Sequence, residues 1–212
     1  MKLMFKIAIL FTALIGLTVF YFRDQLFVEA PTAPAGLQML AALPREVSES
    51  SGLAVIAKDQ YLTHNDAGNP PYLYKLNAAG KLTGTIRLKL PNVDWEDLAQ
   101  DKEGYIYIAD TGNNDNDRRE LAVYKVHPDK PQEVQPIRFT YEDQEEYPPK
   151  KKERNFDSEA LFWNGGNLYI ISKDRGRGQV AKVYQVPASP GTYKARLLHK
   201  HKLKTQVTGA AI

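Results

Sequence analysis

Cysteine is missing from all 212 residues, which excludes disulfides, thiolate metal sites and a cysteine nucleophile. The sequence also lacks the Gly-x-Ser-x-Gly elbow of many hydrolases, the His-Glu-x-x-His pair of zinc proteases and a phosphate-binding glycine loop. The formal net charge is only +3, so charge provides no argument for nucleic-acid binding. The four histidines are scattered along the sequence, and no amphipathic helical pattern follows residue 24.

A single uncharged stretch near the N-terminus covers residues 7–22, after Lys2 and Lys6. Its length and flanking charges predict a hydrophobic helix, with residues 1–24 as a signal-anchor or transmembrane segment and the C-terminal part exported across the membrane. The alternative is a signal peptide cleaved after Ala30, which would release a secreted protein. Residues 25–45 are expected to form a proline-rich linker and a late-pairing strand over 37–43.

Short strand-like segments dominate the sequence from residue 46 onward and recur in a fixed order. Each copy opens on an acidic, small and apolar step, continues to an Asp-x-Gly sequence, and then has an apolar-Tyr-polar-apolar segment. The aspartates of Asp66-Ala67-Gly68, Asp110-Thr111-Gly112 and Asp174-Arg175-Gly176 lie 44 and then 64 residues apart. Such a repeat predicts four-stranded antiparallel blades, and therefore an all-β propeller over residues 46–212.

The repeat also predicts an incomplete ring. Three blades are followed by residues 207–212, which resemble the first strand of a fourth, and a ring of three blades and one strand does not close. A fragment of a longer protein is the favoured interpretation, and closure by oligomerisation is the alternative. The longer second interval comes from a charged, proline-containing insertion at residues 142–154, interpreted as a solvated loop or a docking loop.

Acidic residues are expected to gather at one mouth of the propeller channel. In each blade the first strand lines the channel and the second runs back, so Glu49, Glu96 and Glu159 should lie near the Asp-x-Gly aspartates, 17, 14 and 15 residues later. The candidate ligand-binding residues at this mouth are Glu49, His64, Asp66, Glu96, Asp110, Glu159, Asp174 and Arg175. Carboxylates that converge suit Ca²⁺, which takes six to eight oxygen ligands. The other interpretation is architectural, because Asp and Gly favour turns for local reasons.

Four segments together resemble exported bacterial propeller proteins of the SdiA-regulated, TolB-like and esterase-like phytase types. These segments are residues 49–54, 63–71, 94–99 and 107–114. The resemblance implies six blades, and the metal binding of phytase-like relatives makes Glu96, Asp110 and Glu159 the expected metal ligands. It does not imply a function by itself, because propellers support many activities.

Two functions are consistent with these observations. The first is a membrane-anchored, periplasm-facing binding module for an envelope protein or a small ligand. The alternative is a Ca²⁺-dependent phosphoesterase that resembles a phytase and uses the carboxylate-lined mouth.

Overall fold

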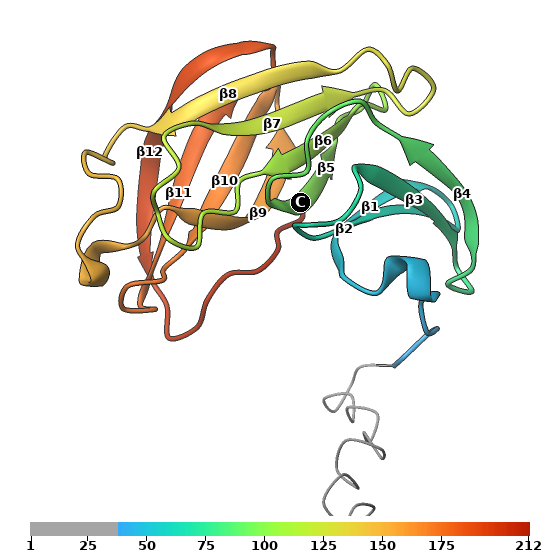
Figure 1. Cartoon of the computed structure of the whole chain (residues 1–212), viewed down its shortest axis with the longest axis horizontal. Coiled ribbons are helices and arrows are strands. Elements are labelled where there is room, and N and C mark those ends of the chain that lie inside the picture. Colours follow the sequence, from blue (N-terminus) through green and yellow to red (C-terminus); the bar gives the residue numbers. More distant parts are fainter. Residues whose placement is uncertain (1–37) are drawn as a thin grey trace, which may run out of the picture. The chain divides into compact units, whose positions relative to one another are not determined.

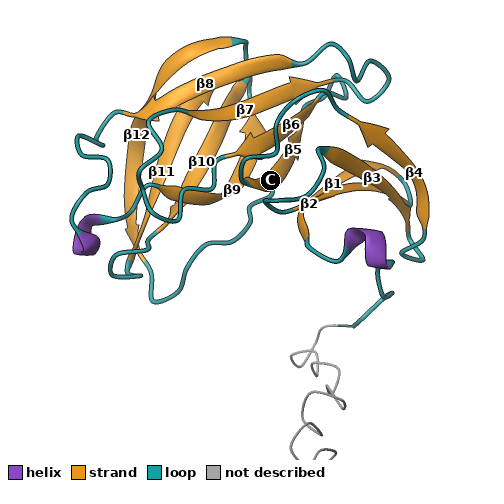
Figure 2. Cartoon of the chain, in the orientation of Figure 1, coloured by secondary structure: helices purple, strands orange, loops and turns teal. Residues whose placement is uncertain are grey.

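A computed structural model describes residues 38–212, whose regular secondary structure is almost entirely β-strand (Figure 2). The all-β prediction is therefore confirmed for this part of the chain. The strands are β1 Ser50–Ala57, β2 Gln60–Asn65, β3 Tyr72–Asn77, β4 Leu82–Arg87, β5 Trp95–Gln100, β6 Ile106–Asp110, β7 Leu121–Val126, β8 Gln135–Tyr141, β9 Asp157–Asn164, β10 Asn167–Lys173, β11 Val180–Pro187 and β12 Gly191–Lys202. Two short 3₁₀ helices, η1 Arg45–Val47 and η2 Lys151–Glu153, accompany them.

The strands form three successive antiparallel meanders of four strands (Figure 1). Glycine occupies several hairpin turns, and Gly80, Gly104, Gly165 and Gly166 all have positive φ. The second and third meanders are joined at their outer edges, because β12 pairs with β8 in parallel and makes one eight-stranded sheet. The sequence did not predict this pairing.

The first strands of the three meanders are neighbours, as in a propeller. β1 packs on β5 and β5 packs on β9. Gly52 of β1 lies so close to β5 that a Cβ atom there would stand 2.5 Å from the backbone nitrogen of Leu98. Asp97 of β5 accepts a hydrogen bond from the Leu161 amide of β9 at 2.8 Å. We therefore describe the arrangement as propeller-like.

The core lies between the meanders and follows from the alternation of the strands. In β6, Ile106 and Ile108 pack with the first meander, whereas Tyr107 and Ala109 pack with the third. Successive side chains of a strand point to opposite faces, so a sheet between two others must be apolar on both. The five buried residues of β6 meet this requirement.

Three expectations about the chain's segments have different outcomes. Residues 38–43 and 207–212 form no strand, and no strand of residues 38–212 pairs with either segment. The expected N-terminal helix and most of the linker at 25–45 lie outside the described residues. Within residues 38–212 there is no helix with the length and apolar character needed to span a membrane.

The insertion at residues 142–154 is held against the third meander through Asp143. Its carboxylate accepts hydrogen bonds from Lys182 Nζ at 2.9 Å and from the Tyr184 hydroxyl at 2.8 Å. Glu142 accepts a further bond from the Leu197 amide of β12. The insertion is thus fastened to β11 and β12 at its start.

Candidate functional site: an acidic cluster between two meanders

The inner strands β5 and β9 each carry two acidic residues separated by one position. Asp94 directly precedes β5 and Glu96 is its second residue, while Asp157 and Glu159 occupy the first and third positions of β9. Residues two apart on an extended chain point to the same side. Each strand therefore directs two carboxylates to one side at its beginning.

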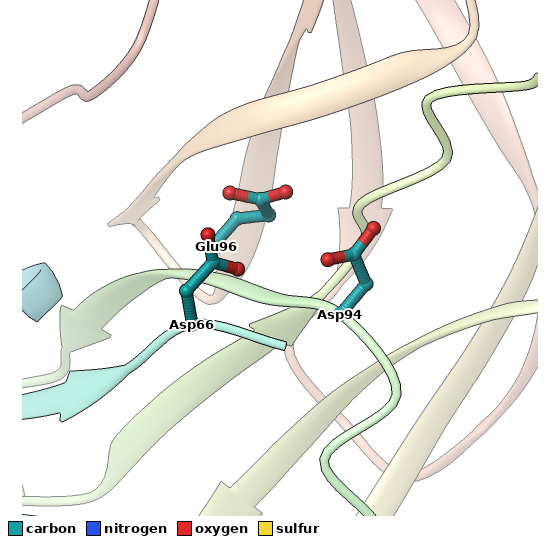
Figure 3. Close-up of side chains that lie close together, drawn as sticks. All are labelled: Asp66, Asp94 and Glu96. Carbon is teal, nitrogen blue, oxygen red and sulfur yellow. The ribbon is translucent and has the colours of Figure 1, made fainter. Parts of the chain in front are cut away.

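Three carboxylates from two meanders come together there, as Figure 3 shows. Asp66 follows β2 of the first meander, and Asp94 and Glu96 begin the second. One carboxylate oxygen from each lies within 4.8 Å of the other two. The segments are tied to each other, because Asn92 Nδ2 donates to the Asp66 carbonyl at 2.9 Å. We call Asp66, Asp94 and Glu96 the acidic cluster.

Burial and mutual repulsion raise the pKa of two members of this cluster, Glu96 and Asp94. Glu96 is 7% exposed, and burial together with the charges of Glu159 and Asp94 raises its pKa to about 9. Burial, with the charges of Asp66 and Asp157, raises the pKa of Asp94 to about 6. No basic side chain of residues 38–212 forms an ion pair with any member of the cluster. A bound cation would therefore remove a real electrostatic cost.

Gly112 forms part of the wall beside the cluster. A Cβ atom at this position would collide with the Asp94 carboxylate and with Glu96 Oε1. The backbone is held in this place by the Gly112 amide, which donates to the Asp94 carbonyl at 3.1 Å. The glycine of this Asp-x-Gly sequence leaves the space that the two carboxylates occupy.

Asp110 is hydrogen-bonded to the backbone of one cluster member, Asp94. It is fully buried, and its Oδ1 accepts hydrogen bonds from the Asp94 amide at 3.2 Å and from Arg118 Nη2 at 2.9 Å. Its Oδ2 is buried without a hydrogen-bond partner in residues 38–212. Asp110, expected as a metal ligand, pairs with Arg118 and accepts a hydrogen bond from the backbone of Asp94.

The second acidic pair, on β9, is neutralised by basic side chains. Arg175 Nε donates to the Asp157 carboxylate at 2.5 Å, and Arg175 Nη2 donates to Glu159 Oε1 at 2.8 Å. Lys173 also pairs with Glu159. Glu159 and Arg175, both expected at the mouth, therefore meet each other, and Glu159 stays close enough to raise the pKa of Glu96.

The other expected site residues have structural contacts. Glu49 accepts a hydrogen bond from Asn69 Nδ2 at 2.5 Å. His64 is fully buried edge-on against Trp95, its Nε2 accepts from the Gly52 amide, and burial lowers its pKa to about 4. Asp174 accepts bonds from four backbone amides of the turn that follows it, at residues 176, 177, 179 and 180.

The three Asp-x-Gly sequences therefore do not make equivalent sites. Asp66 belongs to the acidic cluster, Asp110 is an ion-paired support, and Asp174 caps a turn. The first two meanders pair their inner strands in different registers. Asp110 itself pairs with Trp95, the first residue of β5, whereas Ser50, the first residue of β1, pairs with Asn65, one residue before Asp66. A shift of one residue on a strand reverses the side-chain direction.

The sequence matches no known protein family and no curated protein. Among solved structures, a computationally designed protein called Ika4 is similar, with 16% identity, a TM-score of 0.39, and coverage of 83% of this chain and 87% of that one. A quinonprotein alcohol dehydrogenase-like protein from Bacteroides thetaiotaomicron is similar with 11% identity and a TM-score of 0.36. That match covers 74% of this chain and 46% of that one.

Both TM-scores lie below 0.5, and the propeller-like character of this chain follows from its own strand order and packing instead. The acidic cluster likewise stands on its own geometry. Asp94 and Asp157 were not among the candidate residues. Their signal in the sequence is an acidic-x-acidic step directly before the apolar part of an inner strand, at 94–96 and at 157–159.

Proposed function

We propose that this chain is a ligand-binding module whose ligand is held through a divalent cation, Ca²⁺ in the first place, at Asp66, Asp94 and Glu96. The observation that carries the proposal is the approach of these three carboxylates to within 4.8 Å without a basic partner in residues 38–212. Oxygen ligands lie 2.3–2.6 Å from Ca²⁺, so ligands on opposite sides of the ion are separated by about 5 Å. The spacing of the cluster suits such an ion.

The chemistry of the donors supports the same ion. Carboxylate oxygens are hard ligands that favour Ca²⁺ and Mg²⁺ over Zn²⁺ or Cu²⁺. Ca²⁺ tolerates irregular geometry and completes its shell with water or with the oxygens of a ligand. The open positions of the ion are where an anionic ligand would bind, whether a small molecule or an acidic group of an envelope protein.

Calcium titration of the purified chain tests this proposal. Binding to the native state raises the melting temperature, and ligand at 100 times Kd stabilises by about 2.7 kcal/mol. Millimolar Ca²⁺ should therefore raise the Tm of the wild type, and Asp94→Asn should remove the increase. Asp59→Asn is the matched control, because Asp59 lies in the exposed turn between β1 and β2 and is not part of the cluster. An unchanged Tm for the wild type would refute the cation site.

A second candidate function is hydrolysis of a phosphoester at the same site. Arg175 and Arg118 lie beside the acidic cluster and are bound to its neighbours Glu159 and Asp110. Guanidinium groups bind phosphate oxygens, and a metal ion can activate water for attack on phosphorus. Ca²⁺-dependent release of phosphate from an aryl phosphate, lost in Asp94→Asn, would support this function. Calcium binding without any hydrolysis would refute this second function and leave ligand binding as the proposed function.

We further propose that the module is anchored in a bacterial inner membrane through residues 1–24 and faces the periplasm, as one unit of a six-bladed propeller assembly. The proposal is supported by the uncharged stretch at 7–22 after two lysines and by the propeller-like order of the strands. Cell fractionation of the tagged full chain tests the location. Recovery in the soluble periplasmic fraction with residues 1–30 removed would favour cleavage and secretion instead.

A further inference from the structure

A cavity lies between the insertion at 142–154 and the third meander, and it contains none of the residues of the acidic cluster. Its volume is about 530 Å³, within the range that holds small ligands. Lys182, Phe156 and Asp143 are among its lining residues, and exposed basic residues of the rim include Lys150 and Arg177. Nothing in the proposed cation site uses these groups.

Lys182 is the unusual residue of this cavity. It lies on β11 and is only 8% exposed, whereas lysine is almost never buried unless it is paired. Its Nζ donates to Asp143 Oδ2 at 2.9 Å and lies 3.7 Å from the centre of the Phe156 ring. The amine is thus held in one position, against an aromatic wall and beside one carboxylate, in a cavity that a small molecule can enter.

We propose that Lys182 is the amine of a binding site for small aldehydes and ketones, which it holds as an imine. The neutral Nζ attacks the carbonyl carbon, a C–N bond forms, and the oxygen takes a proton to become a hydroxyl. Loss of that hydroxyl as water, with loss of the remaining N–H proton, gives the imine. The balance is one amine and one carbonyl giving one imine and one water, without an oxidant or reductant.

Asp143 is placed to move the protons of this step. Its Oδ2 accepts the hydrogen bond from Nζ, so it can take the proton of the ammonium group and return it to the departing hydroxyl. Its Oδ1 is held by the Tyr184 hydroxyl at 2.8 Å, which fixes the carboxylate. Burial lowers the pKa of Lys182 despite this hydrogen bond, so more of the amine is neutral than in an exposed lysine.

The charged residues around the cavity opening guide the choice of a carbonyl compound for the experiment. Lys150, Lys152 and Arg177 line the cavity together with Glu145, Glu146 and Glu153, and none of the three basic residues forms an ion pair within residues 38–212. The Asp174 carboxylate nearby is already occupied by backbone amides. An aldehyde that carries a phosphate can place the phosphate at this rim and the carbonyl at Lys182, and pyridoxal 5′-phosphate has both groups.

The test is trapping with pyridoxal 5′-phosphate and borohydride on the full chain, followed by peptide mapping. Because burial lowers the pKa of Lys182 and its amine faces the cavity, Lys182 should carry more adduct than the exposed Lys102. This measurement on the wild type needs no variant that must fold. Adduct spread over the exposed lysines, with Lys182 not preferred, would overturn the proposal.

Two variants sharpen the result. Lys182→Arg should lose the preferred adduct, whereas Lys102→Arg, which changes an exposed lysine outside the cavity, should keep it. Asp143→Asn keeps a hydrogen-bond acceptor for Nζ but not a base, and should slow adduct formation by about 100-fold. An unchanged rate in Asp143→Asn would overturn the role of Asp143, and a persisting preferred adduct in Lys182→Arg would overturn the site.

Discussion

At the scale of the residue, the same type of side chain has opposite uses in this protein. The carboxylates of Asp157 and Glu159 are neutralised by Arg175, and that of Asp174 by backbone amides. Glu96 has neither kind of partner in residues 38–212, and its raised pKa records the difference. Proximity to cations and amides, rather than residue type, therefore separates a supporting carboxylate from a candidate ligand.

The first prediction concerns Glu96→Gln. At pH 7.5 the native state holds a proton on Glu96 that the unfolded state releases, which costs stability. The neutral amide removes this cost, so the metal-free variant should be more stable than the wild type by at least ~1 kcal/mol, one pKa unit being ~1.4 kcal/mol. The same variant should lose the Ca²⁺-induced stabilisation. Urea denaturation with EDTA and with Ca²⁺ measures both effects.

The control for this variant is Glu103→Gln, in the exposed turn between β5 and β6. It should change neither the metal-free stability nor the response to Ca²⁺ by more than about 0.5 kcal/mol. If Glu96→Gln destabilised the metal-free protein, the claim that Glu96 is an unneutralised buried acid would be wrong.

The second prediction concerns Gly52→Ala. The new methyl group would meet the β5 backbone at 2.5–2.7 Å, and backbone cannot move aside as a flexible side chain can. The expected loss is about 1–3 kcal/mol, typical of overpacking. Gly209→Ala, where nothing lies within 4 Å, is the matched control and should be nearly neutral. Equal thermal stability of the two variants would contradict the close approach of β1 and β5.

At the scale of the element, the parallel pairing of β12 with β8 makes both of these outer strands interior strands of one sheet. β8 has β7 on one side and β12 on the other, from Gly191↔Ile137 to Ala195↔Tyr141. The outer strand β4 of the first meander pairs with β3 alone among the described strands. An unpaired edge presents free backbone groups to solvent, whereas an interior strand does not.

The third prediction follows from this difference and concerns hydrogen exchange. Amides of residues 135–141 should exchange slowly, because neighbours on both sides accept and donate backbone hydrogen bonds. Amides of residues 82–87 should exchange faster, on average, than those of β8. Mass spectrometry of peptic peptides measures both segments in one experiment. Similar protection of the two segments would argue against the pairing of β8 with β12.

At the scale of the whole molecule, protons and a divalent cation compete for one acidic cluster, so pH, metal and stability are linked. Glu96 and Asp94 have raised pKa values, of about 9 and about 6, and each loses its favourable contribution as pH rises to its native pKa. His64 acts in the opposite sense. Its pKa is lowered to about 4, so its contribution is complete above 6.5 and is lost as pH falls towards 4.

The fourth prediction is the resulting pH profile. Above pH 6.5 the contribution of His64 is constant, and the metal-free chain should lose stability as pH rises towards 9, because of Glu96. Saturating Ca²⁺ should remove this decline, since the ion replaces the proton. Chemical denaturation at pH 6.5, 7.5 and 8.5, with EDTA or with Ca²⁺, gives the two curves. A metal-free curve that rises over this interval would contradict the assignment of Glu96.

Much of the strand order could be predicted, because its signals are local. Each copy of the repeat coincides with one four-stranded meander, and its Tyr-containing segment is the third strand of that meander. Of the candidate residues, Glu96 and Asp66 lie in the acidic cluster. Asp94 was not a candidate, because the sequence comparison equated Glu49 with Glu96, whereas by strand pairing Glu49 corresponds to Asp94, two positions earlier.

By itself, the sequence determined that the chain after residue 46 is all-β and built of repeated four-stranded meanders. Alternation and turn chemistry act over a few residues, and these interactions are written in consecutive positions. The tertiary structure alone decided which carboxylates share a site, which are neutralised, and that β12 joins β8. It also placed Lys182 in a cavity beside Asp143. These outcomes depend on register and on contacts between distant segments, where a shift of one residue changes the partner.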